Sequence, residues 1–286
     1  MKVLHSGVVA VALWLPLVSV VQAADSPTLT FKFKNVNVHA AKSTVVTAIN
    51  NPGVVVGTYT DQSGILHGFK LAKGKATDID NPAGTLTHPF GINKSGVIVG
   101  DYNKSGLLQA FVYKQGKFTD VGPSGAPESG AFGINDQNEI TGGYLDSSGS
   151  EHGFLLKGGK YITLDVPGAT FTEAEGINNS GTITLTWGNS VGRVESSIYL
   201  SSKYKTIDVP GAKNSYAHSI NSAGDVIFTW TDSSGIFHGA LLRSGEYYKF
   251  EDPNGNSAGN GINDQHILVG AYLISKRVFG GYQATY

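Results

Sequence analysis

The sequence predicts an all-β protein folded as a six-bladed β-propeller, and three observations support this. A phrase built on Ile-Asn recurs six times at spacings of 42 or 43 residues. Turn residues divide each copy into short segments rich in Val, Thr, Ile and Tyr. The last copy lacks one segment, and a matching segment stands near the N-terminus. A period of about 40–45 residues with four strands per unit is typical of propeller blades.

The first 23 residues are expected to lie outside this fold. A charged start is followed by an apolar run from Val8 to Val21, and the small-residue pattern ending at Ala23 resembles a signal-peptide cleavage site. A membrane anchor is the alternative, but Pro16 interrupts the run, which is shorter than the ~20 residues of a span. We therefore expect export from a bacterium, to the periplasm or the medium. The mature chain, 24–286, would have no membrane span.

Composition excludes several classes of protein. The chain has no cysteine, so the mature fold must be held by packing and hydrogen bonds alone. Only 15% of its residues are charged, its net charge is −1, and it has no basic stripe, which argues against a nucleic-acid partner. Thirty-eight glycines among many Thr, Val, Ser and Tyr residues suit a turn-rich β protein.

Each repeat contains one asparagine that we call its anchor. The six anchors are Asn50, Asn93, Asn135, Asn178, Asn221 and Asn263. Gly stands three residues after four of them, while Asn138 and His266 take that place in the third and sixth copies. Asn at the first position of a turn and Gly at the fourth are typical of a type I turn. We therefore interpret the anchors as turn residues and not as a binding site.

Further turns complete the division of each unit into four strands. A second turn has Asp or Asn followed three residues later by Gly, as in Asp61 and Gly64, and a third falls at pairs such as Lys73-Gly74. A Pro/Gly loop such as 165–169 closes the unit. Between them run β-rich segments such as 97–100, and no amphipathic helical period is visible.

The sixth unit ends without its fourth strand, and the N-terminus can supply one. The segment 34–41 aligns with 205–212, and both stand at the same distance from the next anchor. We therefore expect the N-terminal strand to become the outer strand of the sixth blade, which would also cover an exposed sheet edge. A β-solenoid is the main alternative, but it would need no such strand.

A second phrase, His-Gly-Phe in its fullest form, lies about seventeen residues after most anchors. Its middle position is small in all six copies, which indicates close backbone approach, and we expect the aromatic residue to fill the core between blades. Across the hairpin that follows, the histidines should face acidic residues. The predicted pairs are His67 with Asp80, His152 with Asp165, and His238 with Glu251.

Two interpretations of these pairs compete. In one, the pairs lock the outer strands of blades one, three and five, each adding roughly 0.2–1 kcal/mol. In the other, they are metal ligands or acid–base pairs. We favour the structural interpretation because a catalytic group is normally unique, whereas these pairs repeat. Their separate blades would also keep the histidines from converging on one metal ion.

Strand alternation indicates where a ligand would bind. The second turns and the Pro/Gly loops should share one face, and both carry acidic residues. The candidate ligand-face residues are Asp61, Asp80, Asp146, Asp165, Asp208, Asp232 and Glu251. Solvated loops without a ligand are an equal alternative. Calcium would suit such oxygens, but no D-x-D-x-D-G loop occurs. We assign no catalytic residue, metal ligand or cofactor.

The phrases Gly91-Ile92-Asn93, Gly96-Val97-Ile98-Val99-Gly100 and Gln109-Ala110-Phe111 resemble the bacterial extracellular repeat proteins of the HAF type, named for a His-Ala-Phe-like motif. The resemblance covers nearly the whole mature chain and implies propeller-like repeats without a general reaction. This chain departs from it in having mostly Gly at the middle position and in losing the motif in its fourth unit.

The sequence as a whole predicts an exported, non-catalytic binding or scaffold propeller, with extracellular polysaccharide or protein as its partner. Two alternatives stay open. One is a glycan hydrolase or lyase that uses the acidic loop face. The other is a purely structural envelope protein.

Overall fold

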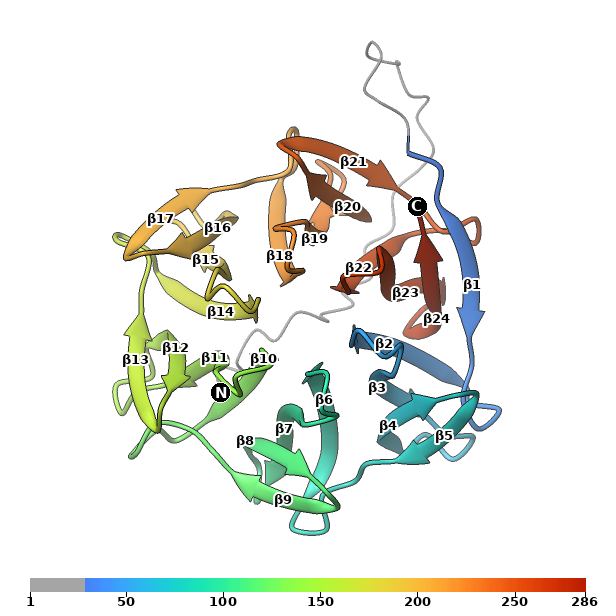
Figure 1. Ribbon diagram of the computed structural model, residues 1–286, viewed down its shortest axis with the longest axis horizontal. Helices are drawn as coiled ribbons and strands as arrows, with labels where there is room; N and C mark the ends of the chain where they lie inside the picture. Colours follow the sequence, from blue (N-terminus) through green and yellow to red (C-terminus); the bar gives the residue numbers. More distant parts are fainter. Residues whose placement is uncertain (1–28) are drawn as a thin grey trace.

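A computed structural model describes residues 29–286, in which every regular element is a β-strand. The strands form six antiparallel four-stranded sheets that stand like blades around a central axis (Figure 1). The six-bladed β-propeller expected from the sequence is therefore confirmed. The expected signal peptide, 1–23, lies outside the described residues. Residues 29–286 contain no helix of the length and apolarity that a membrane span requires.

The blades are numbered here in chain order, and within each the innermost strand comes first. Blade 1 contains β2 (Ser43–Ile49), β3 (Val55–Thr60), β4 (Leu66–Ala72) and β5 (Lys75–Asp78). Blade 2 contains β6 (Thr85–Ile92), β7 (Ile98–Lys104), β8 (Leu107–Lys114) and β9 (Lys117–Asp120). Blade 3 contains β10 (Ser129–Ile134), β11 (Ile140–Leu145), β12 (Glu151–Lys157) and β13 (Lys160–Leu164).

The second half of the ring repeats this order. Blade 4 contains β14 (Phe171–Ile177), β15 (Ile183–Gly188), β16 (Val194–Leu200) and β17 (Lys203–Thr206). Blade 5 contains β18 (Asn214–Ile220), β19 (Val226–Thr231), β20 (Phe237–Arg243) and β21 (Glu246–Phe250). Blade 6 contains β22 (Ser257–Ile262), β23 (Ile267–Ser275) and β24 (Val278–Thr285), and its outer strand is β1 (Lys32–Val36).

The two ends of the described chain meet in blade 6, as the sequence predicted (Figure 1). β1 pairs antiparallel with β24 along its whole length, from Lys32 opposite Thr285 to Val36 opposite Gly281. The strand begins and ends earlier than the aligned segment 34–41. His39 and Ala40 have positive φ angles and form the turn into blade 1, because the chain must reverse there to reach the innermost strand.

The core lies between neighbouring blades, where the sheets pack face to face. Phe69, Phe111, Phe154 and Tyr282, the aromatic residues of the second repeated phrase, are fully buried there. The small residue before each of them allows close approach. A Cβ added to Gly68, for example, would lie 2.5 Å from the carbonyl oxygen of Ile79, just after the outer strand β5. This agrees with the close backbone contact that the sequence predicted.

Every innermost strand has an irregular register with its neighbour shortly before the anchor asparagine. In blade 1, for example, the pairing shifts between Val46 and Ala48. A β-bulge bends a strand and re-aims the side chains that follow it. The six anchors consequently reach the same end of the central channel.

Candidate functional site

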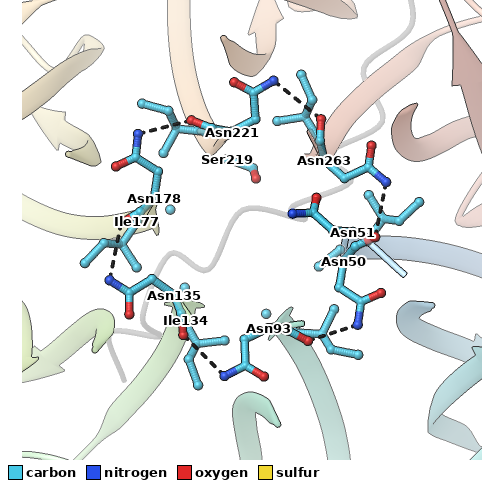
Figure 2. Close-up of a pocket in the computed structure, with 18 of the residues that line it drawn as sticks. Asn50, Asn51, Asn93, Ile134, Asn135, Ile177, Asn178, Ser219, Asn221 and Asn263 are labelled. Carbon is cyan, nitrogen blue, oxygen red and sulfur yellow. Dashed lines mark hydrogen bonds between the residues drawn. The ribbon is translucent and has the colours of Figure 1, made fainter. Parts of the chain in front are cut away.

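The anchor asparagines form a closed ring of hydrogen bonds around the central axis (Figure 2). Each side-chain amide nitrogen donates to the backbone carbonyl of the anchor in the next blade. Asn50 donates to Asn93 over 2.9 Å, for example, and Asn178 donates to Asn221 over 3.1 Å. All six anchors are buried. The ring therefore joins every blade to the next, including blade 6 to blade 1.

The same side chains also build the turns that the sequence predicted. The side-chain oxygen of each anchor accepts the backbone N–H four residues later, as from Val54 to Asn50 over 2.9 Å. The anchors thus use one amide atom for the local turn and the other for the neighbouring blade. The sequence indicated the turn, but nothing in the spacing of the anchors indicated the bond between blades.

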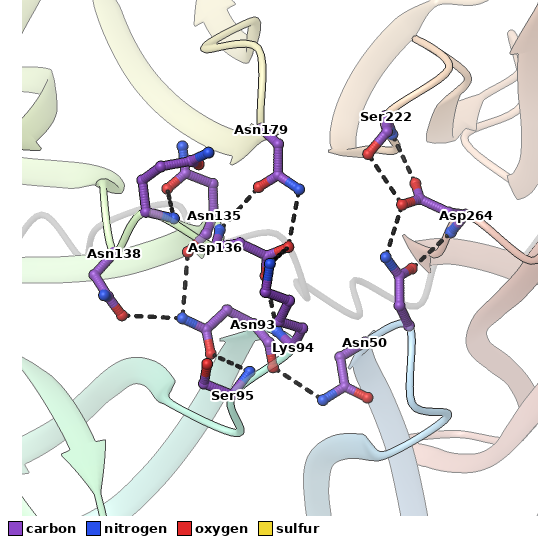
Figure 3. A network of polar contacts seen from close by, with 12 residues as sticks. Asn50, Asn93, Lys94, Ser95, Asn135, Asp136, Asn138, Asn179, Ser222 and Asp264 are labelled. Atoms are coloured by element: carbon purple, nitrogen blue, oxygen red, sulfur yellow. Dashed lines mark hydrogen bonds and ion pairs between the residues drawn. The ribbon is translucent and has the colours of Figure 1, made fainter.

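The anchors lie at one end of the channel, and we call this end of the propeller the Asn-turn face. There the residues that follow the anchors form two further groups of hydrogen bonds between blades, which we call the clasps (Figure 3). The Asp136 carboxylate accepts the Lys94 backbone N–H and the Asn179 side-chain amide, both over 2.9 Å. Asp264 is held in the same way by Ser222 and Asn51, over 2.8 and 2.7 Å. Burial alone would raise the pKa of Asp136, but the hydrogen bonds from Lys94 and Asn179 lower it overall.

A cavity of about 110 Å³ lies in the channel and is lined by the ring of anchors, by residues of the clasps and by the neighbouring channel wall. One water molecule needs roughly 10–15 Å³ of such space, so the cavity has room for several. Its inner wall comes from the position three residues before each anchor, which we call the inner tier. The inner tier consists of Thr47, Phe90, Phe132, Glu175, His218 and Asn260, and all but Glu175 line the cavity directly.

The inner tier contains groups that sequence reasoning did not select. His218 Nδ1 lies 3.8 Å from Glu175 Oε2, and both side chains are 9% exposed. Glu173, two residues earlier on β14, is fully buried, and neither of its oxygens has a well-formed hydrogen bond. Burial raises its pKa well above the usual value, and the nearby charges of Glu175 and Glu151 add to this. The only sequence signal was the irregularity of these positions among otherwise repeated phrases.

The three histidines of the repeated phrase contact the acidic residues that the sequence placed opposite them. His67 Nδ1 lies 2.7 Å from Asp80 Oδ2, and His152 Nδ1 lies 2.8 Å from Asp165 Oδ2. His238 makes the same contact with Glu251. These side chains belong to what we call the acidic-loop face, which is the end of the propeller opposite the Asn-turn face.

Each histidine also approaches an aspartate of the second turn with its other ring nitrogen. The Nε2 to Oδ2 distance is 3.7 Å from His67 to Asp61, and 3.4 Å in both of the other pairs, His152 with Asp146 and His238 with Asp232. The result is three copies of one cluster, in which a histidine stands between two carboxylates. Blades 1, 3 and 5 carry one copy each.

An aromatic ring supports each histidine from the inner side. Tyr59 stacks on His67 with ring centres 5.0 Å apart, Trp230 stacks on His238 at 4.4 Å, and Tyr144 lies 5.3 Å from His152. Lys249 Nζ lies 4.1 Å from the centre of the Trp230 ring. The histidine is thus held in place on three sides, and the carboxylates keep an exposed edge.

The carboxylates raise the pKa of all three histidines. For His67 the hydrogen bond to Asp80 is the main cause. For His152 and His238 burial is the largest single influence and lowers the pKa, but the hydrogen bonds and charges of the two neighbouring carboxylates together outweigh it. The Asp146 carboxylate has its pKa lowered to about 2 by hydrogen bonds from Ser148 and Ser150.

Blades 2 and 4 replace the cluster with other contacts. Gln109 donates to the Val121 carbonyl over 2.8 Å in blade 2. In blade 4, Asp208 accepts the Ser196 backbone N–H over 2.7 Å, and its Oδ2 atom lies 3.4 Å from Arg193 Nη2. Asp208 is therefore the one candidate ligand-face residue whose blade has no histidine in the phrase.

The three clusters are not arranged as a metal centre. Among residues 29–286 no group of three or more His, Asp or Glu side chains is arranged to hold a metal ion. The candidate ligand-face residues are divided among separate clusters and are not brought to one point. Other buried titratable groups, Glu173, Glu175 and His218 among them, come from the innermost strands of blades 4 and 5.

Solved structures with the same overall fold have little sequence in common with this chain. Virginiamycin B lyase from Staphylococcus aureus has 12% identity and a TM-score of 0.51, over 90% of this chain and all of the lyase. A variant of the Aleuria aurantia lectin, solved with Fucα1-6GlcNAc, has 13% identity and a TM-score of 0.55, over 85% of this chain and 93% of the lectin. The SapL1 lectin, solved with α-methyl fucoside, has 11% identity and a TM-score of 0.56, over 85% and 93%.

No protein-family model and no curated protein matches the chain. The likeness to solved structures therefore establishes the propeller fold, which is shared by a lyase and by sugar-binding lectins. The activity must be argued from the residues of this chain.

Proposed function

We propose that this protein is an exported, non-catalytic glycan-binding propeller of the HAF-repeat type, which binds through its acidic-loop face. The observation that carries the proposal is the threefold occurrence of one partly exposed cluster, a histidine between two carboxylates. A catalytic centre needs one set of groups, whereas a polymer of repeating sugars offers many equivalent contacts. Several weak sites on one rigid ring can hold such a polymer far more tightly than one site does.

The chemistry of each cluster suits sugar hydroxyl groups. Asp80 and Asp165 each have 44% of their side chain exposed, and Glu251 has 43%. A carboxylate accepts hydrogen bonds with both oxygens, and neighbouring hydroxyls of a sugar can donate to both. The histidine and the aromatic ring beneath it fix the position of the carboxylate, so little side-chain freedom is lost on binding.

Propeller lectins solved with bound fucosides have the same fold as this chain. This likeness separately supports a glycan as the ligand. Export rests on the signal-peptide pattern of the N-terminal 23 residues. A secreted or periplasmic protein with this fold would meet extracellular polysaccharide.

A glycan-binding panel on the full chain tests the proposal, with the triple variant Asp61→Asn, Asp146→Asn and Asp232→Asn as the main comparison. Blades 2 and 4 carry Asn103 and Asn189 at this position, and there the side-chain oxygen accepts the same kind of turn hydrogen bond. The variant should therefore keep its loops and lose three carboxylates.

We expect the wild type to bind one class of polysaccharide and the triple variant to bind it at least tenfold more weakly. Asn103→Asp is the matched control, because it adds a carboxylate to a blade that lacks the histidine, and it should not change binding. If the wild type binds no glycan, or the triple variant binds equally well, the proposal is wrong. Release of shortened or unsaturated sugars from the bound glycan would instead establish the hydrolase or lyase alternative.

A further inference from the structure

The six residues of the inner tier differ in type from blade to blade, whereas the six anchors do not. The anchors are asparagine in all six blades, which serves the fold. Three residues earlier the same structural position holds hydroxyl, aromatic, carboxyl, imidazole and amide groups in turn. In five of the six blades this position lines the cavity, and a repeated position whose chemistry does not repeat is suited to recognise a ligand.

One wall of the cavity is aromatic. Phe90 and Phe132 come from blades 2 and 3, and their ring centres are 5.6 Å apart with the planes at 86°. They form a corner. Aromatic faces attract C–H groups and cations through the negative face of the ring.

The wall formed by blades 6 and 1 offers hydrogen-bond acceptors. Asn260 donates one N–H of its side-chain amide to the Val46 carbonyl over 2.8 Å, and its side-chain oxygen and second N–H are left for a ligand. Thr47 donates its hydroxyl to the Pro89 carbonyl over 2.6 Å and is left as an acceptor as well. A ligand with donors on this side would therefore satisfy both acceptors.

The charges around the cavity are mostly negative. Glu175 stands beside His218, and its Oε1 atom is buried without a hydrogen-bond partner. At the mouth stand Asp136, Asp264 and one cation, Lys94. Lys94 lies 3.5 Å from Asp136 and offsets its charge, which leaves Asp264 at the mouth and Glu175 beside the lining residue His218 without a Lys or Arg partner among residues 29–286. A buried carboxylate oxygen is stabilised by a cation or an N–H donor.

We propose that this cavity binds a small organic cation with N–H donors, about the size of a single amino-sugar ring. Its ammonium group would lie on the side of His218, which lines the cavity beside Glu175. Its donors would contact Asn260 and Thr47, and its apolar face would rest in the Phe90–Phe132 corner. The site lies on the Asn-turn face and is separate from the three clusters of the acidic-loop face.

Glucosamine is the probe, and glucose is its neutral match, because the two differ by one ammonium-for-hydroxyl replacement. N-acetylglucosamine keeps the nitrogen and removes its charge. Binding to the full chain is measured by calorimetry and by saturation-transfer NMR at pH 7. We expect glucosamine to bind at least tenfold more tightly than either neutral sugar.

Two variants locate the site. Glu175→Gln removes the charge at nearly constant volume, and Phe132→Leu removes one aromatic wall but keeps an apolar side chain. Each should weaken glucosamine binding about tenfold or more, while thermal unfolding verifies that both are folded. The triple Asn variant of the acidic-loop face should bind glucosamine like the wild type.

Equal binding of glucose and glucosamine would overturn the assignment of a cation site, as would no glucosamine binding at all. Unchanged affinity in both folded variants would also overturn it, because the probe would then bind elsewhere. If the wild type binds glucosamine but no polysaccharide, this result would contradict only the function proposed for the acidic-loop face.

Discussion

The side-chain amide of Asn263 in blade 6 donates a hydrogen bond to the backbone carbonyl of Asn50 in blade 1 over 3.1 Å. The same kind of bond joins every other pair of neighbouring blades, so the seam between the chain ends is bonded like the rest of the ring. Each anchor carbonyl also accepts the turn N–H three residues later, as from Gly53 to Asn50 over 3.0 Å, so the carbonyl serves both the turn and the ring.

This ring predicts the effect of Asn178→Asp. The new carboxylate keeps the oxygen that accepts the turn N–H of Thr182 but loses the amide that donates to Asn221. We expect the free energy of unfolding to fall by roughly 1–3 kcal/mol, because a buried carboxylate oxygen would face the Asn221 carbonyl with no hydrogen between them. Urea denaturation measures it, with Asn103→Asp on the acidic-loop face as the control. Equal stability of Asn178→Asp and wild type would mean that the ring contributes nothing.

The pairing of β1 with β24 predicts what removal of the N-terminal strand does. Deletion of 1–37 removes all of β1 and bares the edge of β24, and it also removes the contact of Phe33 with Tyr282, whose ring centres are 5.2 Å apart. Bare edges favour pairing between molecules. We expect a lower unfolding midpoint and oligomers in size-exclusion chromatography. Deletion of 1–28 alone is the control, and monomers of unchanged stability from the longer deletion would refute this.

The three histidine clusters predict how stability depends on pH. Their pKa values are raised in the folded protein above the ordinary value of 6.5, so their stabilising effect is complete below about pH 6.5 and is lost as the pH rises through the folded pKa. The unfolding free energy should therefore fall from pH 6 towards pH 9. The triple variant His67→Gln, His152→Gln and His238→Gln should show a flatter profile in urea denaturation.

Glutamine is the matched replacement, because Gln109 holds the equivalent place in blade 2. Burial raises the pKa of Glu173 too, and this gives a slope of the same sign that the triple variant keeps. Profiles of equal slope for wild type and triple variant would show that the clusters are not linked to folding.

A fourth prediction concerns Gly142 on β11. A Cβ there would lie 2.0 Å from the carbonyl oxygen of Gly130 on the neighbouring strand. The equivalent positions of blades 4 and 5 hold Leu185 and Phe228, so sequence comparison would suggest that a side chain is tolerated. We expect Gly142→Ala to lower the unfolding free energy by about 1–3 kcal/mol or more, because the backbone itself must move. Ser148→Ala on the same blade is the control for thermal unfolding, and a neutral Gly142→Ala would contradict the register.

Much of the fold could be read from the sequence because turns are local. Asn-x-x-Gly spacing fixes where a strand ends, and a constant period fixes how many blades follow. The partners of His67, His152 and His238 could be counted across one hairpin for the same reason. Whether those clusters bind glycans stays a prediction.

The channel could not be read in this way. The amide of Asn50 meets Asn93 more than forty residues later, and only ring closure brings them together. Phe132, Glu175 and His218 come from three successive blades, so no short window of sequence contains them. In the sequence, these residues are distinguished only by their departure from the repeat. Their positions around the channel become known only once the six blades are arranged in a ring.

Closure of blade 6 also sets an order of events. A ribosome makes β1 first and β24 last, so the outer strand of the final blade waits for its partner until nearly the whole chain has been made. A chain that stops before β24 leaves β1 without its partner strand and blade 6 incomplete. An unpaired strand of this kind is open to proteases and to pairing with neighbouring chains until β24 has been made.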